Sequence, residues 1–183
     1  MSVFFKFNSD LDLCLQNNVV VLKPLQRQHF DSLFLVASDK LLWEQHPNPE
    51  RYKLDHFTTF FEGALASDNA FLIFEKSTNE IIGCTRFYDY NEADKSVFIG
   101  YTFIARKFWG KGLNQQVKKV MIAHAFKNID KILFHIGSEN TRSQIAISRT
   151  GAIKIAEQLV EYFGEPPKLN FVYEISKNTY ILN

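Results

Sequence analysis

The segment 106–114 (RKFWGKGLN) places two glycines, Gly110 and Gly112, on either side of a single lysine. It follows an apolar stretch over 97–104 and precedes apolar residues at helical spacing over 114–126. Glycine accepts backbone conformations with positive φ and lets a ligand approach the main chain closely. The sequence therefore predicts a strand, a tight glycine loop and a helix in direct succession.

Such a loop suits an anionic ligand, most often a pyrophosphate, because the first amides of the helix have no partners within it. Those amides also carry the positive end of the helix dipole, and Lys111 adds charge beside them. The spacing differs from the GxGxxG of dinucleotide folds and from the GxxxxGK[ST] of nucleoside triphosphatases. A triphosphatase would need Ser or Thr after the loop lysine, where Gly112 stands. A tight turn without a ligand is the alternative.

Three further motifs accompany the loop: Ile99-Gly100-Tyr101 before it, Asn140-Thr141-Arg142-Ser143 after it, and then Arg149-Thr150-Gly151-Ala152. In this order and spacing they resemble the GCN5-related N-acetyltransferase (GNAT) superfamily. Within it they look like the ribosomal-protein alanine N-acetyltransferases (RimJ/RimL-like). The resemblance covers residues 19–175. It implies an acetyl-coenzyme A-dependent acyltransferase that acetylates a primary amine by direct attack in a ternary complex.

Residue periodicity predicts strands over 19–22, 70–76, 81–90, 96–104, 131–136, 152–160 and 170–176, and helices over 27–38, 54–66, 114–126 and 140–150. With the resemblance, this indicates a single α/β (α+β) domain over 19–183. Its mixed, mostly antiparallel central sheet would have six to seven strands, with helices on both faces. Residues 1–18 would form an N-terminal extension, in which the aromatic segment 4–7 could add an edge strand or pack on a partner.

Composition and charge limit the kinds of partner that we expect the protein to bind. The formal net charge is +1, from 21 basic and 20 acidic residues, so no field of one sign attracts nucleic acid or a membrane surface. The chain shows no apolar run of membrane-spanning length and no signal peptide, so we expect a cytoplasmic protein. Of its two cysteines, Cys84 lies in a strand pattern and is expected in the core. The histidine spacing predicts no metal site. Aromatic residues such as Phe4, Phe5 and Phe163 would allow a homodimer.

The resemblance assigns acetyl-coenzyme A contacts, as co-substrate, to Phe103, Ile104, Lys107, Trp109, Gly110, Lys111, Gly112, Leu113, Asn114, Asn140 and Ser143. The amides from Gly110 to Asn114 would hold the pyrophosphate, and the preceding strand would offer backbone groups to the pantetheine arm. Asn114 stands where the superfamily prefers glycine or alanine, and its side chain could cap the helix instead. Asn140 would cap the next helix with or without a ligand. Trp109 could simply pack.

By the same resemblance, Ser143 would protonate the leaving thiolate, and Glu161, just before an aromatic residue, would be the general base. Burial beside aromatic rings would raise the pKa of that glutamate; the alternative is a solvated strand-end residue. The acceptor would bind near Trp43, His46, Tyr88 and Tyr101, although Trp43 could instead fill the core.

The acceptor would be a protein N-terminus or a small-molecule amine. A non-catalytic acyl-coenzyme A-binding or sensing domain is the alternative function. Such a domain would keep the glycine loop and Asn140 but would lack a working base.

Overall fold

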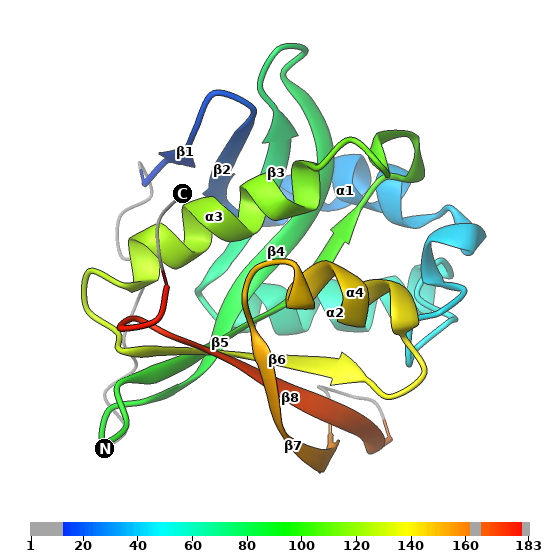
Figure 1. The fold of residues 1–183 in the computed structure, drawn as a ribbon. Helices are drawn as coiled ribbons and strands as arrows, with labels where there is room; N and C mark the ends of the chain where they lie inside the picture. Colours follow the sequence, from blue (N-terminus) through cyan, green and yellow to red (C-terminus); the bar gives the residue numbers. More distant parts are fainter. Residues whose placement is uncertain (1–12, 162–165, 181–183) are drawn as a thin grey trace.

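A computed structural model describes residues 13–161 and 166–180. Within this part of the chain one sheet contains eight strands in the order β1-β2-β3-β4-β5-β6-β8-β7 (Figure 1). The strands are β1 Leu15–Gln16, β2 Val20–Pro24, β3 Ala70–Glu75, β4 Glu80–Asn91, β5 Ser96–Ile104, β6 Lys131–Gly137, β7 Ile153–Val160 and β8 Lys168–Ser176. Only β5 and β6 pair in parallel; all other neighbours are antiparallel. The predicted mixed, mostly antiparallel sheet is confirmed.

The strand beyond the seven expected is β1, which pairs with β2 at the sheet edge. It arises from residues assigned to the N-terminal extension; the extension's boundary stays a prediction. Segment 4–7 and the aromatic residues Phe4, Phe5 and Phe163 lie outside the described residues.

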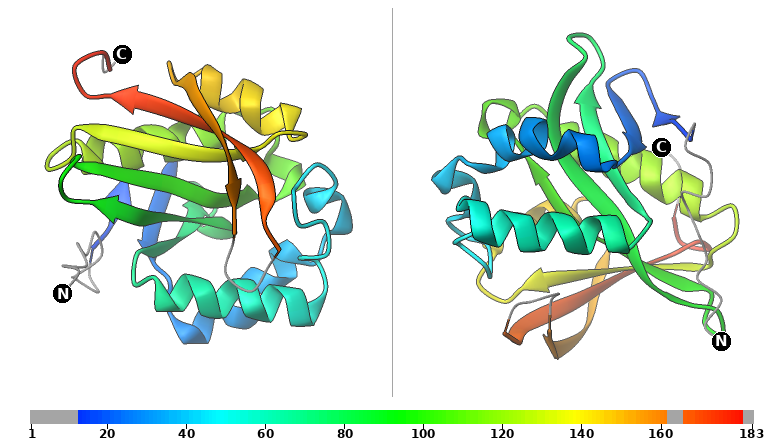
Figure 2. Two further views of the ribbon diagram at one scale, coloured as in Figure 1. Left: turned by 90° about the horizontal axis from the view of Figure 1, so that it is seen from below. Right: turned by 180° about the vertical axis from the view of Figure 1, so that it is seen from behind.

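Helices cover both faces of the sheet, as predicted. They are α1 Phe30–Ala37, α2 Leu54–Ala66, α3 Leu113–Ala125 and α4 Thr141–Ser148, with short 3-10 turns η1 Arg27–His29, η2 Lys40–Trp43 and η3 Arg106–Phe108. Figures 1 and 2 show α3 and α4 on one face and α1 and α2 on the other. No helix among the described residues is both long and apolar enough to cross a membrane.

Apolar residues at helical spacing build a separate core on each face. On α2, the residues Phe57, Phe60, Phe61 and Ala64 recur at i, i+3, i+4 and i+7 and are buried. They pack with Trp43 and residues of β3 to β5. On the other face, α3 contributes its own buried stripe. Burial of each large apolar side chain stabilises the fold by roughly 1.5–3 kcal/mol.

The pairing of β5 with β6 covers only three residue pairs, from Ser96↔Lys131 to Phe98↔Leu133. On its other side β5 stays paired with β4 as far as Ile104↔Gly83, with a register shift near Tyr101, whose φ is +52°. The two central strands therefore diverge, and the N-terminal ends of α3 and α4 face this opening (Figure 1).

Strand β7 forms the far edge of the sheet, and nearly all of its side chains are exposed. Ile153, Ile155 and Leu159 are exposed along it, and its register with β8 shifts between Lys154 and Ala156. An exposed apolar edge is compatible with self-association, and the homodimer stays a prediction.

Close backbone packing at Gly83 gives a test of the β4–β5 pairing. A Cβ at this position would lie 1.9 Å from the carbonyl oxygen of Phe103. Because the neighbour is backbone, no side-chain rotation relieves the clash. Gly83→Ala should lower the free energy of unfolding by about 1–3 kcal/mol, measured by urea unfolding. An unchanged unfolding midpoint would contradict this packing.

Candidate functional site

The glycine loop has the backbone that its sequence predicts. Gly110 and Gly112 adopt φ values of +76° and +75°, and neither would crowd a neighbour if it carried a Cβ. Glycine is therefore required here by conformation, since other residues are strained at positive φ. Gly112 is the N-cap of α3 and has no side-chain cap, so the proposed capping role of Asn114 is wrong. The first amides of α3 are left for solvent or a ligand.

These amides border a cavity of about 640 Å³, which we call the loop cavity. Its lining includes Gly110, Gly112, Leu113 and Asn114 from the loop and α3, Phe103 and Ile104 from β5, and Asn140 and Ser143 from α4. The structure thus brings together most residues expected to contact the co-substrate. Its walls combine backbone amides, a strand edge and apolar side chains.

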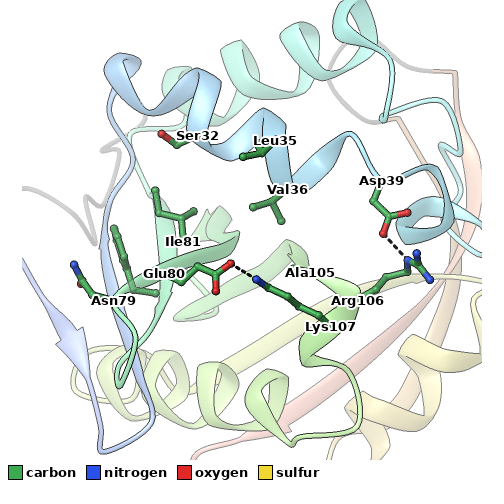
Figure 3. Close-up of a pocket in the computed structure, with 11 residues that line it drawn as sticks. Ser32, Leu35, Val36, Asp39, Asn79, Glu80, Ile81, Ala105, Arg106 and Lys107 are labelled. Atoms are coloured by element: carbon green, nitrogen blue, oxygen red, sulfur yellow. Dashed lines mark hydrogen bonds and ion pairs between the residues drawn. The ribbon is translucent and has the colours of Figure 1, made fainter.

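Two lysines of the loop region lie elsewhere. Lys111 is exposed and does not line the loop cavity; its Nζ lies 5.1 Å from the centroid of the Phe108 ring. Lys107 forms an ion pair with Glu80 in a separate groove on the α1 side (Figure 3). The expected charge contribution of these side chains to the loop cavity is therefore not seen.

That second groove, about 890 Å³ in volume, lies between α1, the β3–β4 turn and η3. Its two cations are paired, Lys107 with Glu80 and Arg106 with Asp39, the latter at 2.5 Å (Figure 3). The glycine amides do not line it. Although it is larger, its two cationic side chains are each paired with a carboxylate, which disfavours an anionic ligand.

Arginines supply the positive charge that the lysines do not. Arg142 and Arg149 of the α4 segment both line the loop cavity. The Arg142 guanidinium lies 4.0 Å from the centroid of the Trp109 ring, a cation–π contact that joins α4 to the loop. Trp109 Nε1 donates to the carbonyl oxygen of Ile104 at 2.7 Å. Trp109 is thus a packed residue that also forms a wall of the cavity. Sequence reasoning used both arginines only as markers of the motifs.

Asn140 is the N-cap of α4, and its Oδ1 accepts a hydrogen bond from the Ser143 amide at 3.1 Å. The capping interpretation is confirmed, and the side chain is buried. Ser143 lies in the first turn of α4, and both residues line the loop cavity. The capping hydrogen bond uses the backbone amide of Ser143, so the Ser143 hydroxyl lies beside Asn140 and takes no part in the cap.

A second cavity, the strand cavity, continues from the loop cavity into the gap between β5 and β6. Its volume is about 90 Å³. Seven residues line both cavities: His46, Thr102, Asn114, Lys118, Asn140, Ser143 and Ala146. Two ligands bound in the two cavities would therefore meet beside the first turn of α4.

The expected acceptor residues surround the strand cavity, except Trp43. His46, Tyr88 and Tyr101 line it. Trp43 is buried, donates from Nε1 to the carbonyl oxygen of Ala37 at 2.7 Å, and borders the loop cavity instead. Sequence reasoning missed Arg86, which is buried with its guanidinium carbon 3.3 Å from the centroid of the Tyr101 ring.

Glu161 is exposed just after β7 and lines neither cavity. The burial expected from the sequence is absent, and its neighbour Tyr162 lies outside the described residues. Its role as general base stays a prediction without structural support.

Lys118 is the other residue that sequence reasoning missed. It is buried on α3, and its Nζ donates to Thr102 Oγ1 at 2.6 Å. Burial lowers the pKa of this amine to about 7. A signal was present in the sequence: Lys118 stands four residues before Ile122, on the face of the helix that packs inward.

Known protein families and solved structures with a similar fold agree with this geometry. The family model "Acetyltransferase (GNAT) domain" matches residues 20–153. A GCN5-related N-acetyltransferase from Brucella melitensis superposes with a TM-score of 0.79 at 15% identity, covering 94% of this chain and 82% of the other. A GNAT-family acetyltransferase from Bacillus anthracis gives 0.73 at 15% identity, covering 91% and 99%.

Mycobacterium smegmatis RimJ, in complex with CoA-disulfide, gives a TM-score of 0.68 at 16% identity, covering 87% of this chain and 82% of RimJ. No curated protein matches the sequence significantly. At these identities the solved structures show similarity of fold alone. The family model, which spans most of the chain, shows that the protein is a member of the family. The protein therefore belongs to the GNAT acetyltransferase family and is an acyltransferase that uses acetyl-coenzyme A.

Proposed function

We propose that the protein transfers the acetyl group of acetyl-coenzyme A to a primary amine, on a protein N-terminus or a small molecule, in a ternary complex. The observation that carries this proposal is the junction of the two cavities at Asn140 and Ser143. An acetyl donor in the loop cavity and an amine in the strand cavity would meet there, so that binding itself brings the reacting groups together.

The residues present fit the co-substrate. The α3 amides and the positive-φ glycines suit the pyrophosphate. Arg142 and Arg149 offer charge for its phosphates. The part of β5 not paired with β6 offers backbone groups to the pantetheine arm. Acetyl-coenzyme A supplies the activated thioester, and the chain's own residues bind it, orient it and move protons.

Direct attack is favoured because the structure offers no activated thiol at the junction. Cys84 lines neither cavity, and burial raises the pKa of its thiol to about 12. Cys14 is exposed near the β1 edge, on a different part of the fold. The Ser143 hydroxyl at the junction is suited to protonate the leaving thiolate.

The acceptor end of the site disfavours a polycation. Arg51 is buried beside the strand cavity, and its guanidinium stays charged. A polyamine would bring further positive charge into the same low-dielectric space. The small volume of the strand cavity suits the amine end of an acceptor, with the remainder outside.

Co-substrate binding through the loop is tested with Gly112→Val. A β-branched residue is strained at positive φ and would move the α3 amides. We expect acetyl-coenzyme A affinity, measured by calorimetry, to fall at least about tenfold, or ~1.4 kcal/mol. Gly151→Val is the matched control, because Gly151 has a φ of +88° and lines neither cavity. Equal loss in both variants, or preference of the wild type for ATP, would contradict the loop assignment.

Transfer itself is tested with Ser143→Ala. We expect thiol release with an amine acceptor to slow by about 10- to 100-fold in kcat, since one proton donor is lost. The acetyl-coenzyme A affinity should stay unchanged, because the Ser143 amide still donates to Asn140. A wild type that binds acetyl-coenzyme A but acetylates no peptide N-terminus or small amine would instead support the non-catalytic binding domain.

A further inference from the structure

The side chain of Lys118 lies in an unusual place for a lysine. It projects from α3 into the region where the loop cavity and strand cavity meet, and it lines both. Only 6% of the residue is exposed. Its Nζ donates to Thr102 Oγ1 and lies 5.8 Å from the centroid of the Phe134 ring. The surroundings are thus one neutral hydroxyl and an aromatic face.

The hydroxyl that holds Lys118 is itself fixed. Thr102 Oγ1 lies 2.7 Å from Thr85 Oγ1, and it can donate to the Gly100 carbonyl oxygen at 3.3 Å. With its proton directed to Gly100, the Thr102 hydroxyl accepts from Lys118. A neutral amine would keep its lone pair free after making this one hydrogen bond.

No carboxylate among the described residues pairs with Lys118, and none lines either cavity. The ionisable groups that line the two cavities around it are Tyr88 on β4, Tyr101 on β5, His135 on β6, His46 and Arg51 in the segment before α2, and Arg142 and Arg149 on the α4 side. Without a counter-charge, burial favours the neutral amine, in agreement with a pKa of about 7.

Other candidate bases in the strand cavity are already engaged. His46 Nδ1 accepts from the Asn48 amide at 2.9 Å, and its Nε2 faces Arg51 Nη1 at 3.2 Å. Burial, then repulsion by Arg51, lowers the pKa of His46 well below its usual value. The two ring nitrogens of His135 contact Tyr88 Oη and Gln158 Nε2. Neither imidazole offers a free nitrogen to an acceptor amine.

We propose that Lys118 is the general base of the acetyl transfer, a role that rests on the function proposed above. The acceptor nitrogen forms the C–N bond to the acetyl carbon, and the C–S bond of the thioester breaks. The proton lost by the acceptor nitrogen goes to the Lys118 amine. The thiolate leaves and takes a proton from the Ser143 hydroxyl, which regains one from solvent, and Lys118 releases its proton to solvent. No other reactant is needed.

Lys118→Met and Lys118→Arg test this role, with Lys127→Met as control on an exposed lysine just after α3. Methionine matches the length of the side chain without a base, and arginine keeps the charge but cannot deprotonate. With the best acceptor among alanine- or serine-initiated peptides and simple amines, kcat should fall about 10²- to 10⁴-fold in both Lys118 variants. Lys127→Met should match the wild type.

The pH dependence separates a base from a positioning role. Since only the neutral amine accepts a proton, wild-type kcat at saturating acceptor should rise with pH through about 7. This limb should vanish in both Lys118 variants. Calorimetry with acetyl-coenzyme A and thermal unfolding should show that both variants stay folded and bind the co-substrate.

A readout independent of activity is the titration of the protein labelled with ¹³C at lysine Cε. One resonance, missing in Lys118→Met, should titrate near pH 7, well below the value of about 10.4 for lysine in model peptides.

Three results would overturn the role of Lys118: undiminished turnover in Lys118→Met, recovery of turnover in Lys118→Arg, which would indicate a charge anchor, or a Lys118 resonance that titrates near 10. A wild type without turnover on any amine would instead remove the proposed function, and the role of Lys118 with it.

Discussion

The early end of the β5–β6 pairing is the constraint on which the site depends. After Phe98 each strand follows its other partner, since β5 stays with β4 to Ile104 and β6 stays with β8 to Gly137. A parallel pair that parts in mid-sheet exposes backbone groups that must find other partners. It also makes room in the centre of the sheet, which the strand cavity occupies.

The same divergence brings two helix N-termini to one opening. The loop before α3 and the cap of α4 come from separate strand–helix connections, and they meet because β5 and β6 begin together. The helix amides, Arg142 and Arg149 border the loop cavity, whereas the buried Lys118 stands at the junction and the strand cavity is lined by Arg51 and two engaged histidines. In the mechanism proposed above, one continuous path would bind the anion at its entrance and transfer the proton inside, and the low dielectric of the interior would favour the proton transfer.

Local patterns predicted the elements closely where burial is one-sided and periodic. Helix α2 begins and ends where the spacing of Phe57, Phe60 and Phe61 predicts, and Asn140 caps α4 because its side chain suits that position in any context. Strand β1 was missed since two residues carry no period. Asn114 was misjudged as a cap because Gly112 already occupies the N-cap with a left-handed backbone.

By itself, the sequence determined the order of the strands and helices, the glycine loop and the residue types around the start of α3. The reason is that backbone conformation and amphipathic spacing are local properties. Only the tertiary structure decided which basic side chains face the site. Lys107 and Lys111 belong to the loop but lie outside its cavity, whereas Lys118, next to the similar Lys119, is buried at the junction. Helical spacing puts Lys118 on the inward face of α3, but what that face borders depends on how α3 lies across the diverging strands.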